Sequence, residues 1–270
     1  VMLDLLHLNE KGYRLWAAAM EPTLSRLLGE DNGRFARLSR LFGPKRGWFA
    51  PFVRNRFYVD RDYNSPIPRT YWIELSAKCN LKCPFCPTGK GLYYNDVSMM
   101  TFDMYKKLFD KIKHYALYIY FHRHGEPTLN KDLLKIVRHT ADHGGLYTVF
   151  STNLNTVKYD PVKSEELILS GISEVIASID GASEESYSKY RRGASYDFAI
   201  ANLKVLAETK IRLGSKTPKL NWQFLINRFN EHEVDLARQI ASDIGVEIYF
   251  LLMKVWGGEE WISSYHRDPD

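Results

Sequence analysis

The chain has 270 residues, of which 45% are hydrophobic, and its 37 basic and 32 acidic residues give a formal net charge of +5. This modest charge, with no dense run of Lys and Arg among aromatic residues, gives no strong signal for a nucleic-acid interface. No apolar stretch approaches the ~18 residues that a membrane span needs, so we expect no membrane span. All three cysteines lie between positions 79 and 86, which excludes a secreted disulfide framework and predicts a reducing, cytoplasmic compartment.

Residues 1–69 differ in pattern from the rest of the chain. Apolar side chains recur every three to four residues between Leu5 and Leu27, which is the spacing of an amphipathic helix or helix pair. Prolines and glycines interrupt residues 43–68, and this composition is typical of a loop. We therefore expect an N-terminal, mainly helical extension over residues 1–69.

From residue 70 onwards, short apolar strands alternate with helical patterns. Asn230 and Gly245 are the predicted N-cap and stop of the last helix. Alternation with short connections predicts parallel strands joined by helical crossovers. The predicted fold class is therefore α/β, a partial (β/α)6 TIM-like barrel over residues 70–255, with residues 256–270 starting a C-terminal extension or tail. The predicted strands are 71–75, 116–121, 146–151, 173–179, 220–226 and 246–253, and the predicted helices are 102–114, 131–143, 161–169, 196–213 and 231–244.

Polar side chains follow the predicted strands at the points where the strands end. In barrels of parallel strands, ligand sites form at the carboxyl ends of the strands. The sequence therefore predicts a binding site at this rim. The residues concerned are Cys79 after the first strand, His124, Gly125 and Glu126 after the second, Ser151, Thr152 and Asn153 at the third, and Ser178 and Asp180 at the fourth.

The stretch CNLKCPFCP, residues 79–87, contains the three cysteines Cys79, Cys83 and Cys86. Their spacing lets one tight loop direct three thiolates at a common centre, and thiolates select zinc, copper(I) or iron–sulfur clusters. A structural zinc site would need a fourth ligand, which His122 or His124 could supply. An iron–sulfur cube held by three cysteines instead leaves one iron open for chemistry. A third interpretation is a buried group of thiols without any metal.

The cysteine loop and the segment after the second strand resemble those of the radical S-adenosylmethionine (SAM) enzymes. The signature of that family is CxxxCxxC after the first strand of a partial (β/α)6 barrel, and CNLKCPFC matches it in spacing and in place. The resemblance implies that Cys79, Cys83 and Cys86 bind a [4Fe-4S] cluster and that the backbone of Phe85 meets the adenine of SAM. HGEP, residues 124–127, is similar to the GGEP motif of the family, with histidine replacing the first glycine. This implies that Gly125 and Glu126 approach the methionyl amino group.

Three further motifs resemble the same family in the same order. STN at 151–153 is similar to the segment that contacts the SAM ribose, which implies roles for Ser151 and Asn153. SIDG at 178–181 and YRRG at 190–193 resemble the branch whose members often carry a SPASM or twitch extension, and they imply that Ser178, Asp180 and Arg191 help to hold SAM. No cysteine follows Cys86, so the chain resembles the core of that branch without auxiliary-cluster cysteines.

The resemblance implies an enzyme that cleaves SAM reductively to a 5′-deoxyadenosyl radical, which then abstracts hydrogen from a substrate. It also implies an electron donor such as flavodoxin or ferredoxin. The substrate is not encoded in these motifs, and a peptide or small natural-product precursor is weakly favoured. The alternative function is a zinc-bearing or degenerate, non-catalytic binding module on the same fold. Candidate substrate contacts by position are Tyr120, His122, Gln223, Asn227, Tyr249 and Lys254.

Overall fold

The computed structural model describes residues 68–92, 99–255 and 257–266. The predicted helical extension at 1–69 therefore lies almost wholly outside the described residues. Six strands form one sheet in sequence order, and every neighbouring pair is parallel. The strands are β1 (Thr70–Trp72), β2 (Tyr118–Tyr120), β3 (Tyr147–Thr152), β4 (Glu174–Ser178), β5 (Lys219–Ile226) and β6 (Glu247–Leu252).

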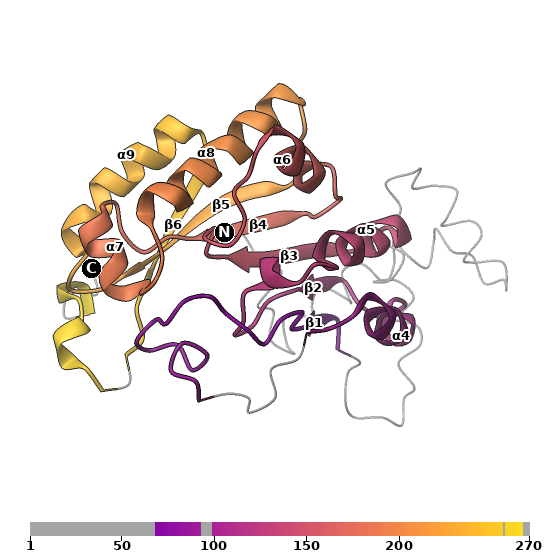
Figure 1. Ribbon diagram of the computed structural model, residues 1–270, viewed down its shortest axis with the longest axis horizontal. Coiled ribbons are helices and arrows are strands. Elements are labelled where there is room, and N and C mark those ends of the chain that lie inside the picture. Colours follow the sequence, from indigo (N-terminus) through magenta and orange to yellow (C-terminus); the bar gives the residue numbers. More distant parts are fainter. Residues whose placement is uncertain (1–67, 93–98, 256, 267–270) are drawn as a thin grey trace, which may run out of the picture.

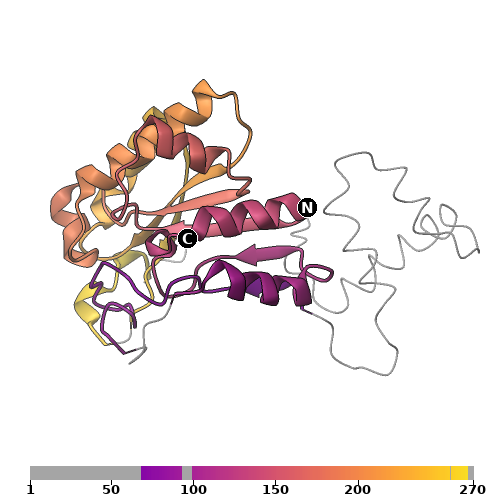
Figure 2. The same ribbon diagram turned by 45° about the vertical axis from the view of Figure 1, so that its right-hand side comes forward.

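Helical crossovers connect the strands and cover the outer face of the curved sheet (Figures 1 and 2). No pairing joins β1 to β6 among the described strands, so the sheet is an open, partial barrel of the TIM type. The predicted fold class is confirmed. The helices are α4 (Phe102–Ile112), α5 (Leu133–His143), α6 (Pro161–Ile168), α7 (Glu184–Tyr190), α8 (Tyr196–Arg212) and α9 (Val234–Ile244), with short 3-10 turns at Pro127–Leu129, Glu231–Glu233, Glu259–Trp261 and Ser264–His266.

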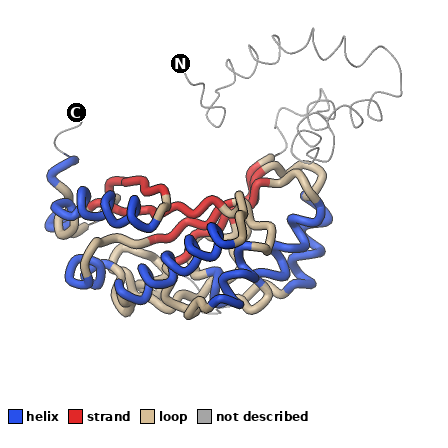
Figure 3. Tube along the Cα trace, turned by 90° about the horizontal axis from the view of Figure 1, so that it is seen from above, coloured by secondary structure: helices blue, strands red, loops and turns tan. Residues whose placement is uncertain are grey.

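The two faces of the sheet differ in burial because successive strand residues point to opposite sides. Ile119, Phe150 and Trp222 point toward the helices and have no exposed surface. Their neighbours Tyr120 and Gln223 point to the inner face and are only half-buried. Figure 3 shows the helices packed along the outer side of the strands. The apolar core therefore lies between strands and helices, and the inner face remains available for a ligand.

The first predicted strand is longer than the observed one. The prediction covered residues 71–75, whereas β1 ends at Trp72. Beyond it, Ile73 still donates its N–H to the Tyr120 carbonyl at 2.8 Å. The Glu74 carboxylate then accepts from the His124 and Gly125 N–H groups at 2.9 and 3.1 Å. The chain after β1 thus bonds to the loop after β2 instead of continuing the ladder.

Two further details differ from the sequence prediction. Helix α7 was not predicted, because it has only seven residues and follows a turn motif, although Ser183 caps it by accepting from the Ser186 N–H at 3.3 Å. The predicted cap of the last helix was wrong. Asn230 makes no side-chain cap bond, and its amide instead donates to the Asp180 and Leu225 carbonyls at 3.1 and 2.9 Å. Gly245 ends α9 in the left-handed conformation as predicted.

Candidate functional site

The residues selected from the sequence converge at the carboxyl edge of the sheet. Asn153, directly after β3, donates its backbone N–H to Glu126 Oε2 at 2.8 Å. Its side-chain amide lies 3.8 Å from the Cys79 sulfur and 2.9 Å from Asn80 Oδ1. One amide residue therefore connects the loops after β1, β2 and β3, which are far apart in the sequence.

The cysteine loop directs three free thiols into this site. Cys83 is 6% exposed, and Cys79 and Cys86 are half-buried. The Leu81 N–H donates to the Cys79 sulfur at 3.4 Å, and hydrogen bonds to cysteine sulfurs are one of the means by which proteins tune iron–sulfur clusters. The loop is fixed from outside, because the Lys82 N–H donates to the Arg192 carbonyl at 2.9 Å.

Burial raises the pKa of the Cys83 thiol to about 11, although the nearby Arg191 guanidinium opposes this rise. The Cys79 and Cys86 thiols contribute to the shift, so the three sulfurs lie close enough to influence one another. Buried thiolates need positive charge beside them, and metal ions supply it directly. Three thiols, an N–H group aimed at a sulfur and an adjacent guanidinium therefore fit an iron–sulfur cluster.

A single-ion site with three close ligands is not found in the part of the chain that the structure describes. A cube spreads its ligands more widely, because each thiolate binds a different iron. His122, considered above as a zinc ligand, has its Nδ1 occupied as the acceptor of the Ser151 N–H at 3.0 Å.

Glu126 is 3% exposed and anchors the loop after β2. Its Oε1 accepts from the N–H and hydroxyl of Thr128 at 3.1 and 2.6 Å, and its Oε2 accepts from Asn153. Burial raises the pKa of this carboxyl, and hydrogen bonds from Thr128, Asn153 and the Thr152 side chain oppose the rise. A carboxylate has about four acceptor positions, and these donors occupy them, so the carboxylate holds the loops after β2 and β3 together.

Gly125 packs against the backbone of the loop after β1. A β-carbon at this position would lie 1.7 Å from the Ser76 carbonyl oxygen and 2.9 Å from that of Lys78. Only glycine allows this approach, which brings the Glu126 nitrogen to 2.7 Å from the Lys78 carbonyl oxygen. The glycine in HGEP is thus explained by packing against the segment that precedes Cys79.

Gly125→Ala should therefore destabilise the chain by about 3 kcal/mol or more, because backbone atoms cannot move aside as a side chain can. The measurement is denaturant unfolding of both proteins. Gly214→Ala is the control, since Gly214 has a φ of +58° with open space around it, and only the left-handed backbone conformation should cost about 1 kcal/mol. Equal losses for the two variants would contradict the packing argument.

Asp180 and Arg191 form a buried ion pair beside the cysteines. The Arg191 Nε lies 2.6 Å from Asp180 Oδ2, and the two side chains are 14% and 0% exposed. Asp180 Oδ1 also accepts from the Leu225 N–H at 2.8 Å. Burial raises the pKa of Asp180, and Arg191 opposes the rise. Arg191 points inward, whereas its neighbour Arg192 is exposed, so Arg191 is the arginine of YRRG that belongs to the site.

Ser151 and Ser178 meet on the inner face, with their hydroxyl oxygens 2.7 Å apart. His122 lies in the same layer, and burial lowers its pKa to about 4. Because Nδ1 accepts a hydrogen bond, the neutral ring carries its proton on Nε2. These three residues continue the rim formed by Asn153 and Asp180 into the interior of the barrel.

The ring of Phe85 faces the C-terminal segment. Its centroid lies 5.5 Å from that of Trp261 in an edge-to-face arrangement. Trp261 also contacts Phe229 and Tyr190 at centroid distances of 4.7 and 6.0 Å. An apolar cluster, separate from the main core, thus links Met253 and Trp261 with the cysteine loop.

The other candidate substrate contacts differ in whether their side chains already have partners within the protein. Tyr249 and Gln223 bond to each other across β5 and β6 at 3.0 Å. The Asn227 amide oxygen accepts from the Phe229 N–H at 2.9 Å within its own loop, and Lys254 is exposed. Tyr120 stacks on Trp72 at 4.9 Å and meets the edge of His122 at 5.8 Å.

Sequence reasoning missed several polar residues that support this site. Asn155 accepts from the Ser195 N–H and donates to the Tyr187 hydroxyl, at 2.8 and 2.9 Å. Glu233, 6% exposed, accepts from the Ala182 N–H at 2.7 Å just after SIDG. Glu74 supports HGEP as described above. The sequence shows Asn155 two residues after STN and the acidic residues Glu233 and Glu74. It does not show which distant N–H groups these side chains bind.

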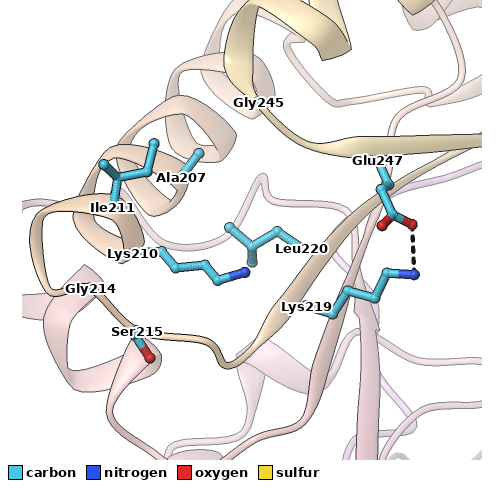
Figure 4. A pocket seen from close by; sticks show the side chains of 9 residues that line it. All are labelled: Ala207, Lys210, Ile211, Gly214, Ser215, Lys219, Leu220, Gly245 and Glu247. Carbon is cyan, nitrogen blue, oxygen red and sulfur yellow. Dashed lines mark ion pairs between the residues drawn. The ribbon is translucent and has the colours of Figure 1, made fainter.

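A pocket of about 240 Å³ lies at the opposite end of the sheet, where β5 and β6 begin (Figure 4). Lys219 and Glu247 form an ion pair of 2.6 Å on its wall. It contains none of the candidate site residues. Among the described helices, none is both long and apolar enough to cross a membrane.

A parallel α/β barrel with three thiols and a buried ion pair at its carboxyl edge has the donor set for a thiolate-bound group. Residues 73–237 match the Radical SAM superfamily, which is more than half of the chain. The chain therefore belongs to this superfamily and is an enzyme of the radical SAM type.

Individual relatives agree with this assignment. The chain is 26% identical over 196 residues to the AdoMet-dependent heme synthase of Methanosarcina barkeri, covering 72% of this chain and 53% of that protein. It is 25% identical over 185 residues to the PqqA peptide cyclase of Bradyrhizobium diazoefficiens, covering 67% and 45%. The structure of Streptococcus suis SuiB bound to S-adenosylmethionine has the same fold, with a TM-score of 0.60, 17% identity and coverage of 94% and 54%. The chain thus spans about half the length of these relatives.

Proposed function

We propose that Cys79, Cys83 and Cys86 hold a [4Fe-4S] cluster with one open iron, and that the chain binds SAM there. Bound together, the cluster and SAM supply one-electron cleavage of a carbon–sulfur bond, which yields a 5′-deoxyadenosyl radical able to abstract hydrogen from a substrate. The observation that carries the proposal is the convergence of three thiols, a buried carboxylate and a buried guanidinium at the carboxyl edge of a partial barrel.

The residues of the site have complementary parts in this proposal. Glu126 offers its carboxylate to the SAM ammonium in exchange for one of its present donors, and Gly125 keeps that loop close to the cysteines. Arg191 has one nitrogen bonded to Asp180, which leaves the rest of its donor fork for the SAM carboxylate. The Phe85 backbone meets the adenine. Ser151, Asn153 and Ser178 bind the ribose side.

The substrate is held over the inner face of the barrel. This face combines a ladder of rings, Trp72, Tyr120 and His122, with the polar pair of Tyr249 and Gln223, whose hydroxyl and amide oxygens lie 3.0 Å apart. Rings beside amide and hydroxyl groups suit a substrate with both apolar and polar parts. A peptide or small natural-product precursor meets this requirement, and the name of the PqqA peptide cyclase supports the peptide class.

The test is SAM cleavage by the anaerobically purified and reconstituted chain, with dithionite as reductant. We expect 5′-deoxyadenosine and methionine in equal amounts, iron and sulfide at about four each per chain, and absorbance near ~400 nm. Stoichiometric zinc without that absorbance would instead support the zinc-bearing binding module. A loaded cluster without SAM binding would support a degenerate relative. The motifs SIDG and YRRG further support membership of the SPASM or twitch branch, and flavodoxin or ferredoxin is the proposed physiological electron donor.

A further inference from the structure

The inner face of the sheet carries a polar group nearer the amino ends of the strands, formed by Glu174, Tyr147 and Asn221, which we call the Glu174 cluster. Glu174 Oε2 accepts from the Tyr147 hydroxyl at 2.8 Å, and Oε1 accepts from the Asn221 amide nitrogen at 2.6 Å. Glu174 lies on the same side of β4 as Ser178, because side chains alternate along a strand, whereas Val175 belongs to the main core on the other side. The Glu174 cluster therefore lies inside the barrel, about 13 Å along β4 from Ser178.

The Glu174 cluster has more hydrogen-bond acceptors than donors. Asn221 is 5% exposed, and its Oδ1 is buried without a hydrogen-bond partner in the part of the chain that the structure describes. This oxygen lies beside the carboxylate, because the nitrogen of the same amide donates to Glu174. Each Glu174 oxygen has about two acceptor positions, and one of them is used. Buried polar atoms are normally paired, so three oxygens here favour a ligand that donates.

The charge of Glu174 is not neutralised by a cation among the described residues. Lys219 is its register partner on β5, but the Lys219 ammonium lies 2.6 Å from Glu247 instead (Figure 4). Burial, and after it the charge of Glu174, raises the pKa of Tyr120 and raises that of Tyr249 to about 12. An uncompensated negative charge therefore acts on the interior of the barrel.

Aromatic rings lie around the same carboxylate. The centroids of Tyr118 and Tyr147 are 5.8 Å apart, with the rings tilted by 56°. Tyr120 belongs to the same row of the sheet as Glu174, because both pair with Val149. Ring faces attract ammonium groups. An ammonium has three N–H donors and no acceptor, so it fits a carboxylate and an unpaired amide oxygen among tyrosine rings.

We propose that the Glu174 cluster binds the ammonium group of a lysine side chain in the substrate. This inference rests on the proposed function and names the substrate class of the same barrel. The three N–H donors bond to the two Glu174 oxygens and to Asn221 Oδ1. Because the cluster lies about 13 Å along the strand from Ser178, it holds a part of the substrate that is remote from the reacting atom, and such remote binding energy orients the reacting centre.

The test measures the affinity of Nα-acetyl-lysine methylamide for the reconstituted full chain by isothermal titration calorimetry. The norleucine analogue lacks the ammonium, and the Nε-trimethyl-lysine analogue keeps the charge without N–H donors. Glu174→Gln removes the charge with little change of shape, and Asn221→Leu removes the unpaired oxygen. Glu208→Gln is the matched control, since it makes the same change at an exposed position on α8. SAM cleavage by the wild type with dithionite is measured in parallel.

We expect Glu174→Gln to bind the lysine analogue about tenfold more weakly, because hydrogen bonds to charged groups are the stronger ones. Asn221→Leu should lose a smaller factor, and Glu208→Gln should equal the wild type. The norleucine and trimethyl-lysine analogues should bind the wild type more weakly than the lysine analogue does, and Glu174→Gln should not weaken the norleucine analogue further.

Three results would overturn the ammonium subsite. They are undetectable binding of the lysine analogue to the wild type, equal or tighter binding of either comparison analogue, and an equal loss of the lysine and norleucine analogues in Glu174→Gln, which would indicate damage to the fold. Absence of dithionite-driven SAM cleavage in the wild type would overturn the proposed function, whereas the affinities of the analogues would still decide the subsite.

Discussion

Cys83→Ala is expected to abolish cluster binding and to reduce SAM cleavage by about a thousandfold or more, because two thiols cannot hold a site that needs three. Iron content should fall from about four per chain to near zero. Cys83 is the most buried of the three cysteines, so a water molecule can least easily replace its thiolate as a ligand of iron. The measurements are iron and sulfide content, absorbance, and 5′-deoxyadenosine formed with dithionite.

Two controls separate loss of the cluster from damage to the fold. Lys78→Ala changes an exposed side chain next to Cys79 and should retain both iron and activity. The Cys83→Ala variant itself should unfold within about 1 kcal/mol of apo wild type, since it removes one small buried group. Full iron content in Cys83→Ala would exclude the three-cysteine site. Unfolding of the apo variant under native conditions would show that Cys83 has a structural role instead.

The strand ends were predictable from the sequence, because hydrophobic runs of strand length mark the sheet and polar residues follow them. Asn153 and Asp180 lie where that reasoning placed them, one residue after β3 and two residues after β4. The rule works because parallel strands bring all their carboxyl ends to one edge. The assignment of Asn153 and Asp180 to SAM binding remains a prediction, whereas their proximity to the cysteines is a property of the structure.

The supporting residues could not be predicted in the same way. Glu74 accepts from N–H groups some fifty positions later, and His122 replaces a backbone carbonyl as the acceptor of the Ser151 N–H. Such contacts depend on strand register and loop path, which local sequence patterns do not encode. The misassigned cap has the same cause, because Asn230 serves distant carbonyls rather than its own helix.

Asp180→Ala is expected to cost about 3–5 kcal/mol of folding free energy, because it leaves the Arg191 guanidinium buried without its carboxylate. It also removes the acceptor of the Leu225 N–H. Asp180→Asn keeps an acceptor but loses the charge, so we expect an intermediate loss. Asp235→Ala removes the partner of Arg238 from an exposed pair and should have little effect. Chemical denaturation of the four apo proteins under one set of conditions measures these differences.

The double variant Asp180→Leu/Arg191→Met distinguishes a stabilising pair from one retained for ligand binding. Replacing both buried charges by apolar groups is often neutral for stability, so we expect the double variant to be within about 1 kcal/mol of wild type and well above Asp180→Ala. SAM binding should nevertheless be weakened about tenfold or more, since the donor fork of Arg191 is gone. A double variant as unstable as Asp180→Ala would show that the pair stabilises the fold. Unchanged SAM affinity would remove Arg191 from the binding site.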